Sequence, residues 1–153
     1  MLVACATARP VAVQQQLPDE LAARYRGRVV VLDFWASWCK ECKDTVPVIS
    51  RLALTFARDG LVVVGVNAGD AAAEVPGFAR ELGIDYPVTP DPELVLSDRL
   101  GAARLPAVLV IDRQGAIVHR ARRVDAETLV VIRRLLGRDV SPQARDARGP
   151  AAP

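Results

Sequence analysis

Residues 29–42 read VVVLDFWASWCKEC, and this stretch decides the fold. Its first six residues are apolar and rich in β-branched side chains apart from Asp33, which predicts a buried, central strand. Cys39 and Cys42 follow, where the strand gives way to a helix predicted over residues 39–57. Residues three apart on a helix share one face, so the two sulfurs can close a bond without large movement.

The predicted position of Cys39, at the start of a helix, favours a reactive thiolate. The start of a helix carries unpaired N–H groups and the positive end of the helix dipole, which stabilise a thiolate, and the thiolate is the nucleophile. Lys40 adds to this effect, whereas Glu41 opposes it, so the neighbouring charges alone do not give the direction in which the pKa of Cys39 shifts. We expect Cys39 to attack a disulfide and Cys42 to resolve the mixed disulfide.

The rest of the chain alternates apolar strands with amphipathic segments. Further strands are predicted over 61–66, 107–112 and 116–120, the last two joined as a hairpin by the turn at Gly115. Helices are predicted over 71–82, 92–100 and 126–136, with Asp91 and Asp125 as caps. Pro47 should kink the first long helix. The order predicts an α/β fold, a mixed central sheet with helices on both faces.

Length and composition limit the alternatives. The 153 residues fit one domain, which we place at 19–138, between a flexible N-terminal segment at 1–18 and a disordered tail at 139–153. The net charge of +2 gives no reason to expect nucleic acid as a partner. The group Arg120, Arg122 and Arg123 is read as a solvated strand end.

No metal site and no bound cofactor are expected. A structural zinc site would need all three cysteines and the single histidine, His119, from distant places. Lys43 follows Cys42, so the pair is not a haem attachment motif. His119 is expected to be a partly exposed strand residue without a catalytic role.

The segment Leu2–Cys5 has the form of a bacterial lipoprotein processing box. A secretory signal needs a basic segment and an apolar run before the cleavage site, and only four residues precede Cys5. Two readings stay open: a chance match, or a lipid anchor at Cys5 with the true start upstream. The first favours the cytoplasm, and the second favours the cell envelope or periplasm.

The segment from Asp33 to Lys43, with Pro47 five residues after Cys42, resembles the active-site segment of thioredoxins. The remainder, about residues 21–137, is similar to the TlpA/ResA branch of bacterial envelope thiol–disulfide reductases. The resemblance implies a thioredoxin fold with a TlpA-type insertion of a strand and a helix at about 68–94, which includes Tyr86.

The resemblance also assigns roles to individual residues. Pro106 matches the family's cis-proline beside the cysteine pair, and the main chain at Leu105 would pair with an extended substrate by strand addition. Asp33 matches a buried acid beneath Cys42. A carboxyl group in an apolar strand has a raised pKa and can accept a proton. Trp38 would shield the disulfide. For Trp35, a plain core position is as good an expectation as a place in the site.

The sequence departs from the family's pattern in four places, which concern substrate choice, redox poise and packing. Glu41 stands where proline is common, so Lys40 and Glu41 leave the direction of redox flux open. Thr45 replaces a frequent acid, Ala107 replaces a threonine, and Arg122-Arg123 replace a region that usually holds a glycine. We count Trp38, Leu105, Lys40 and Glu41 as substrate-binding, and Cys39, Cys42, Asp33 and Pro106 as catalytic.

The predicted activity is reduction of protein disulfides by a monomer, with a thiol electron donor that re-reduces the pair. The resemblance implies a membrane thiol transporter as donor and apocytochrome c as a client, hence cytochrome c maturation or envelope thiol homeostasis. Three alternatives remain: a disulfide oxidant of the same fold, a peroxidase of the peroxiredoxin type, and a metallochaperone that holds Cu(I) between the thiolates.

Overall fold

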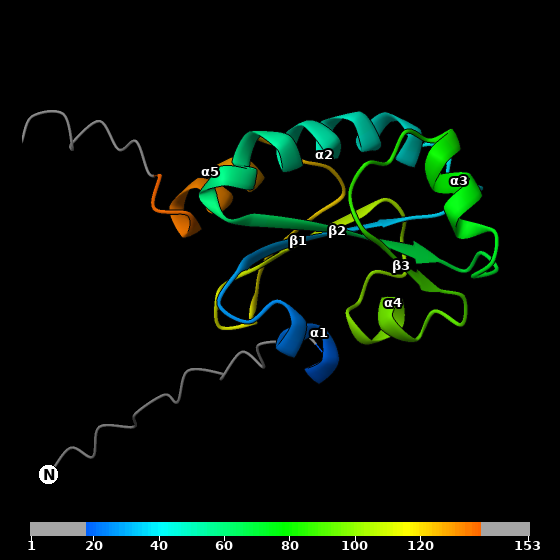
Figure 1. Ribbon diagram of the computed structural model, residues 1–153, viewed down its shortest axis with the longest axis horizontal. Helices are drawn as coiled ribbons and strands as arrows, with labels where there is room; N and C mark the ends of the chain where they lie inside the picture. The colour runs from blue at the N-terminus through cyan, green and yellow to red at the C-terminus, as the bar shows by residue number, and fades with distance from the viewer. Residues whose placement is uncertain (1–17, 139–153) are drawn as a thin grey trace, which may run out of the picture.

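The computed structural model describes residues 18–138 and contains a five-stranded sheet between two layers of helices (Figure 1). The strands are β1 (Val29–Trp35), β2 (Leu61–Ala68), β3 (Val88–Asp91), β4 (Ala107–Ile111) and β5 (Ile117–Ala121). The helices are α1 (Asp19–Arg24), α2 (Cys42–Phe56), α3 (Val75–Glu81), α4 (Val95–Arg99) and α5 (Ala126–Leu135), with a 3-10 turn at Ala57–Asp59.

The sheet is mixed, with the order β3-β2-β1-β4-β5. The pairs β1·β2 and β2·β3 are parallel, whereas β1·β4 and β4·β5 are antiparallel. Strand β1 lies at the centre and is buried along its whole length, as its apolar sequence predicts. The α/β thioredoxin fold with helices on both faces is confirmed.

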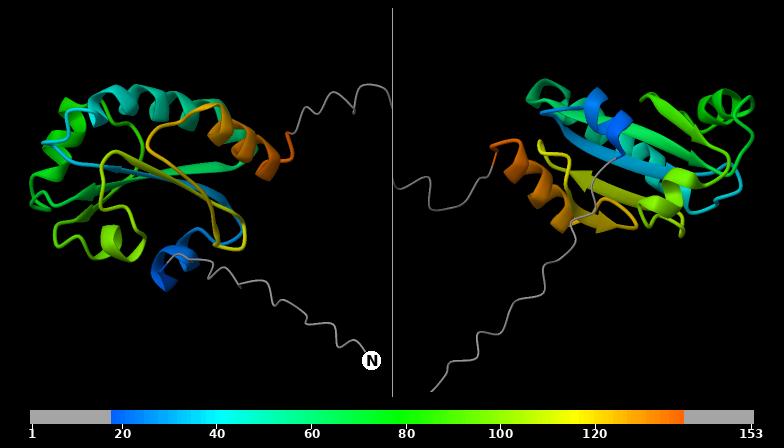
Figure 2. Two further views of the ribbon diagram at one scale, coloured as in Figure 1. Left: turned by 180° about the vertical axis from the view of Figure 1, so that it is seen from behind. Right: turned by 90° about the horizontal axis from the view of Figure 1, so that it is seen from below.

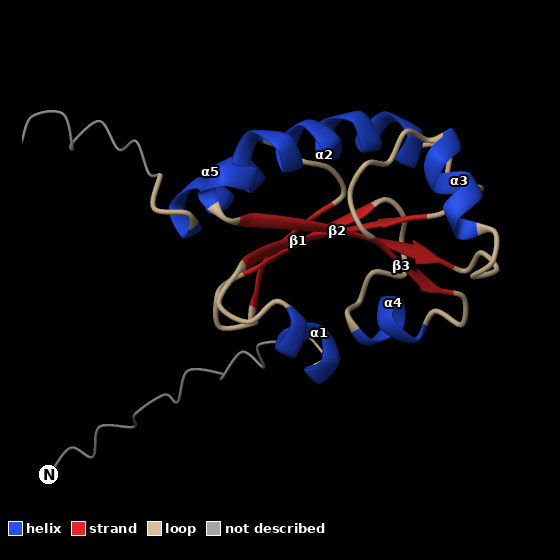
Figure 3. Cartoon of the chain, viewed as in Figure 1, coloured by secondary structure: helices blue, strands red, loops and turns tan. Residues whose placement is uncertain are grey.

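Alternate residues of β1 face the two layers. Val29 and Val31 pack under α2 and α5 in one core cluster, with Ile49 and Ile132. Val30, Leu32 and Phe34 form a second cluster that α1 and α4 cover. Figures 2 and 3 show the strands as one layer between these helices. The side of the sheet that α2 covers therefore receives the side chain of Asp33.

Several boundaries differ from the sequence-based expectation. Helix α2 begins at Cys42 rather than Cys39, and Pro47 lies inside it. Helix α4 has only five residues, because Leu94 adopts a positive φ of 60° that interrupts the predicted helix. Strand β3 and helix α1 were not predicted from periodicity, since four and six residues are too short for a clear pattern.

The segment proposed as an insertion, about residues 68–94, holds α3 and the edge strand β3. The predicted hairpin β4–β5 and the cap at Asp125, which accepts a hydrogen bond from Thr128 N, are both present. Asp91 also caps, but from the end of β3: its carboxylate accepts the N–H groups of Leu96 and Ser97.

The predictions for Cys5 and for both terminal segments lie outside the described residues, apart from Pro18. Within residues 18–138, no helix combines the length and apolar character needed to cross a membrane.

Candidate functional site

Cys39 and Cys42 form a disulfide, with 5.4 Å between their Cα atoms. Cys39 is 6% exposed and Cys42 is fully buried. Because α2 begins at Cys42, Cys39 lies in the preceding turn and not in the helix, which corrects the predicted position. Its sulfur nevertheless accepts the backbone N–H of Cys42, the first helical residue, at 3.2 Å. The expected support from the helix start therefore reaches the Cys39 sulfur by this contact.

The turn before the cysteines is tied to the end of β2. Asp70 accepts hydrogen bonds from both the N–H and the hydroxyl of Ser37, each at 2.7 Å, and from the amide of Asn67 at 2.7 Å. Burial by itself raises the pKa of Asp70, but the bonds from Asn67 and Ser37 outweigh burial and lower it. Asp70 thus fixes the loop that carries the cysteines.

The peptide bond between Leu105 and Pro106 is cis, as predicted. Leu105 packs against the cluster that contains Cys39 and Cys42. Pro106 is buried and lines a groove of about 460 Å³ together with Glu41. The chain thus brings Leu105-Pro106 and the cysteine segment, more than sixty residues apart in sequence, to one place on the surface.

Asp33 is completely buried in β1, and one residue in the described structure, Tyr86, gives its carboxyl a hydrogen bond. The Tyr86 hydroxyl donates to Asp33 Oδ2 at 2.6 Å, while Oδ1 has no hydrogen-bond partner among the described residues. Burial raises the pKa of Asp33 to about 6, and the Tyr86 bond opposes part of this rise. Burial and the nearby Asp33 charge also raise the pKa of Tyr86.

Gly65 makes room for this pair. It stands opposite Asp33 in the β1–β2 register. A Cβ atom at Gly65 would lie 3.0 Å from Trp35 Nε1, 3.2 Å from Tyr86 Cε2 and 3.2 Å from Val88 Cγ2. The missing side chain is what allows the Tyr86 ring to pass over β2 toward Asp33.

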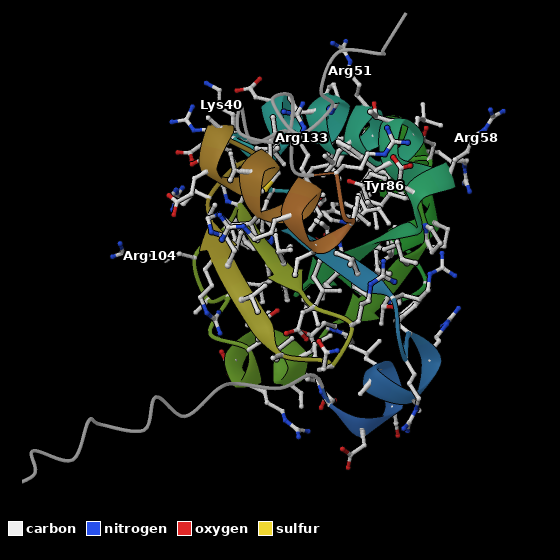
Figure 4. The ribbon with its side chains drawn as sticks, turned by 90° about the vertical axis from the view of Figure 1, so that its left-hand side faces the viewer. Lys40, Arg51, Arg58, Tyr86, Arg104 and Arg133 are labelled. Carbon is white, nitrogen blue, oxygen red and sulfur yellow. A yellow bond between two sulfur atoms is a disulfide. The ribbon has the colours of Figure 1, made fainter. Side chains whose placement is uncertain are left out.

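The remaining predicted site residues lie on the surface around the cysteine pair, and we call these exposed residues the rim. Trp38 is 68% exposed beside the buried disulfide, and Lys40 and Glu41 are also exposed. Figure 4 shows Lys40 and Arg104 pointing outward, and Tyr86 inside the molecule. Trp35 is fully buried, so it is a core residue.

Sequence reasoning missed Tyr86, Asp70 and Arg122 as site residues. Arg122 pairs with Glu41 at 2.6 Å and donates to the Leu105 carbonyl at 3.1 Å. The sequence offered one signal for it, since Arg122-Arg123 stand in a region that usually holds a glycine. His119 is half-buried and bonds Thr128 at 2.9 Å, away from the cysteines. Residues 18–138 contain no group of three or more potential side-chain ligands placed to hold a metal ion.

Comparison with known proteins agrees with this geometry. The model of the AhpC/TSA family matches residues 13–120. The thiol–disulfide oxidoreductase ResA of Geobacillus thermodenitrificans is 31% identical over 93 residues, which cover 61% of this chain and 53% of ResA. ResA of Bacillus subtilis is 28% identical over 105 residues, 69% of this chain and 59% of that protein. This chain therefore spans little more than half the length of the curated relatives it matches.

Among solved structures, a thiol:disulfide interchange protein of the thioredoxin family from Chlorobium tepidum TLS superposes with a TM-score of 0.62 at 25% identity. The match covers 76% of this chain and 85% of that one. The family model covers the cysteine pair and strands β1 to β4, and the chain therefore belongs to the AhpC/TSA family; it is similar to the ResA thiol–disulfide oxidoreductases.

Proposed function

We propose that this protein is a thiol–disulfide oxidoreductase that reduces protein disulfides through Cys39 and Cys42. The observation that carries the proposal is the unequal pair: a disulfide in which Cys39 is 6% exposed and Cys42, at the start of α2, is fully buried. An outer cysteine can meet a substrate, and a buried one can act only on its neighbour. The similarity to ResA supports the same activity.

The reaction begins with the reduced pair. Cys39 thiolate attacks one sulfur of the substrate disulfide, the substrate S–S bond breaks, and its other sulfur leaves as a thiolate that takes a proton. Cys42 then gives up its proton and attacks the Cys39 sulfur of the mixed disulfide. The Cys39–Cys42 bond forms and the substrate leaves as a dithiol. Two electrons and two protons have moved to the substrate.

Asp33 is the proposed acceptor for the Cys42 proton. Its side chain lies on the face of β1 that α2 covers, and α2 begins at Cys42. A carboxyl group with a pKa of about 6 is close enough to neutral pH to take up and release a proton during turnover. A water molecule could carry the proton between the two groups.

The substrate is proposed to lie along Leu105 and Pro106. An extended chain beside Leu105 would pair with its main chain, which holds the substrate sulfur near Cys39. Trp38, Lys40 and Glu41 form the exposed rim that such a chain meets. Protein disulfides in extended segments are therefore the proposed substrate class.

Trapping the mixed disulfide tests the proposal. A Cys42→Ser variant should accumulate a covalent complex with insulin or a disulfide peptide, whereas Cys39→Ser should form none. Mass spectrometry should place the bond at Cys39. A complex in Cys39→Ser through Cys42, or no reduction of insulin by the wild-type protein, would rule out these roles.

Direction and setting are also proposals. A cell-envelope location, a membrane thiol transporter as donor and apocytochrome c as a client are proposed from the resemblance to the TlpA/ResA branch alone. A strongly oxidising potential of the pair would make the protein an oxidant instead. Tight stoichiometric Cu(I) binding without insulin reduction would favour a metallochaperone. Peroxide consumption that persists in Cys42→Ser would favour a peroxidase.

A further inference from the structure

Arg122 joins the two halves of the site through one nitrogen atom. Its Nη2 donates to Glu41 Oε2 at 2.6 Å and to the Leu105 carbonyl oxygen at 3.1 Å. Glu41 stands between the two cysteines, and Leu105 precedes the cis Pro106. A single guanidinium therefore bridges the cysteine segment and the proline loop, which are more than sixty residues apart in sequence.

The bridge lies at the groove of about 460 Å³ next to Pro106. Four charged side chains line this groove: Glu41 and Asp44 are acidic, Arg122 and Arg123 are basic. Arg104, which points outward next to Leu105, adds a third positive charge on the side of the proline loop (Figure 4). An extended segment lying along Leu105 would thus meet both signs of charge, with Arg122 already paired to Glu41.

The Arg122 contact occupies an acceptor that the substrate needs. This step rests on the proposed function, in which the Leu105 main chain pairs with an extended substrate. The Leu105 carbonyl oxygen has two lone pairs, and Arg122 takes one of them, so a substrate N–H must share this oxygen with the guanidinium. Arg122 and Glu41 are 54% and 71% exposed at their side chains, so water screens their attraction and the bridge opens at low cost.

We infer that Arg122 is a specificity-determining residue, which an acidic side chain of the substrate draws away from Glu41 and from the Leu105 carbonyl. A carboxylate one or two residues from the substrate cysteine replaces Glu41 as the partner of the guanidinium. The released carbonyl then pairs with the substrate main chain, and Glu41 turns to solvent, where it is already mostly exposed. A basic substrate residue can pair with Glu41 or Asp44 but not with the guanidinium, so it leaves Arg122 on the Leu105 carbonyl.

Two disulfide peptides that differ at one residue test this inference. Each carries an intermolecular disulfide to a chromogenic thiol, with either Glu or Lys next to the cysteine. The rate constant of single-turnover reduction is measured with the reduced protein. The wild-type protein should reduce the Glu peptide about three- to fivefold faster than the Lys peptide, the scale of an exposed ion pair.

Matched variants assign the preference to Arg122. Arg122→Gln should lose most of the preference, whereas Arg123→Gln, which removes a charge from the same groove, should keep most of it. Glu41→Gln removes the competing carboxylate and should widen it. The ratio of two peptide rates cancels any change in the intrinsic reactivity of Cys39, and circular dichroism confirms that each variant is folded.

The outcomes separate this inference from the proposed function. If the protein reduces neither insulin nor either peptide, the oxidoreductase assignment fails. If insulin is reduced but the two peptides react equally or the Lys peptide reacts faster, only the role of Arg122 is overturned. An unchanged preference in Arg122→Gln would also overturn it, because the selectivity would then come from other charges.

Discussion

Tyr86 reaches across β2 to donate a 2.6 Å hydrogen bond to Asp33, a residue 53 positions earlier in the chain. Both side chains are buried, and Gly65 provides the space between them. The bond stabilises the charged form of a carboxylate that burial disfavours. Tyr86 therefore sets how readily Asp33 holds its proton, and it is a positioning residue for the proposed proton transfer.

Tyr86→Phe removes this donor and keeps the ring. The pKa of Asp33 should then rise above its present value of about 6, because the one interaction that lowers it is lost. The acid limb of the pH–rate profile for peptide disulfide reduction should move to higher pH. Loss of a bond to a buried carboxylate should also cost about 1–3 kcal/mol of stability at pH 8.

Tyr25→Phe is the matched control for that experiment. Tyr25 packs with α1 on the opposite side of the sheet and lies near Arg24, 5.5 Å from ring centroid to guanidinium. Its hydroxyl should not influence the profile. Equal profiles for wild type and Tyr86→Phe, measured on folded protein, would remove Tyr86 from the mechanism.

Asp33→Asn should stabilise the protein at pH 8 while slowing the second step of disulfide exchange. The native carboxyl keeps its proton up to about pH 6, whereas the unfolded chain releases it near 3.8, so stability falls as the pH rises through this window. Above both pKa values, the buried charge of Asp33 lowers the free energy of unfolding by about 3 kcal/mol. The amide carries no charge and can still accept the Tyr86 hydrogen bond.

Urea unfolding at pH 8 and at pH 4 measures this effect within one variant. The gain should be large at pH 8 and small at pH 4, where the wild-type carboxyl is already protonated in the native state. A gain of equal size at both pH values would mean that packing, and not the buried charge, is responsible. Slower release of product from the mixed disulfide at pH 7 should accompany the stabilisation.

The cysteine segment was predictable because its information is local. A continuous apolar run, a Cys-x-x-Cys spacing and Pro47 lie within one stretch, so periodicity and motif agree. The cap at Asp125 and the β4–β5 hairpin were predictable for the same reason. The cis bond at Pro106 came from resemblance alone, since no local rule distinguishes it from an ordinary proline before a strand.

The contacts that shape the site were not predictable, because each joins distant segments. Asp33 could be recognised as a buried acid, but its partner lies beyond β2 and α3, next to a strand too short to detect. Arg122 is one of three arginines in four residues, and only the bend of the chain after β5 selects it for Glu41. Side-chain pairing across a sheet depends on register, which composition does not specify.

Asp70→Asn should destabilise the protein at pH 7 by about 1–3 kcal/mol, because the amide cannot reproduce three hydrogen bonds to a carboxylate. The lowered pKa of Asp70 means that its contribution is present above pH 3.8 and is lost as the pH falls further. Wild type and variant should thus converge in acid. Asp98→Asn, a change at an exposed position of α4, is the control and should have little effect at either pH.

The Asp70 variant should also show a functional effect that a purely structural loss would not. Ser37 precedes the cysteines by two residues, so a looser turn should place Cys39 less accurately against the substrate. Peptide disulfide reduction should lose rate, while the reaction of Cys39 with a small alkylating reagent should not. Equal loss in both reactions would indicate that the thiolate of Cys39 has itself become less reactive, and not that it is misplaced.

Gly65→Ala tests whether the space beside Asp33 is required. The added Cβ would approach Trp35 and Val88 as well as the Tyr86 ring, at 3.0–3.2 Å, and two of these neighbours belong to the packed sheet face. We expect a loss of about 1–3 kcal/mol from overpacking and a weakened bond between Tyr86 and Asp33. The pH–rate profile should therefore shift upward, in the same direction as for Tyr86→Phe.

Gly77→Ala separates this effect from the general consequence of replacing a glycine. Gly77 lies within α3, and a Cβ there would meet nothing within 4 Å, so alanine should be neutral or stabilise the helix by about 0.4–1 kcal/mol. Combining Gly65→Ala with Tyr86→Phe supplies the decisive comparison. If Gly65 acts through the Tyr86 hydroxyl, the double variant should show the pH–rate profile of Tyr86→Phe alone. A further upward shift in the double variant would mean that Gly65 influences Asp33 by another route, with Trp35 as the next side chain to substitute.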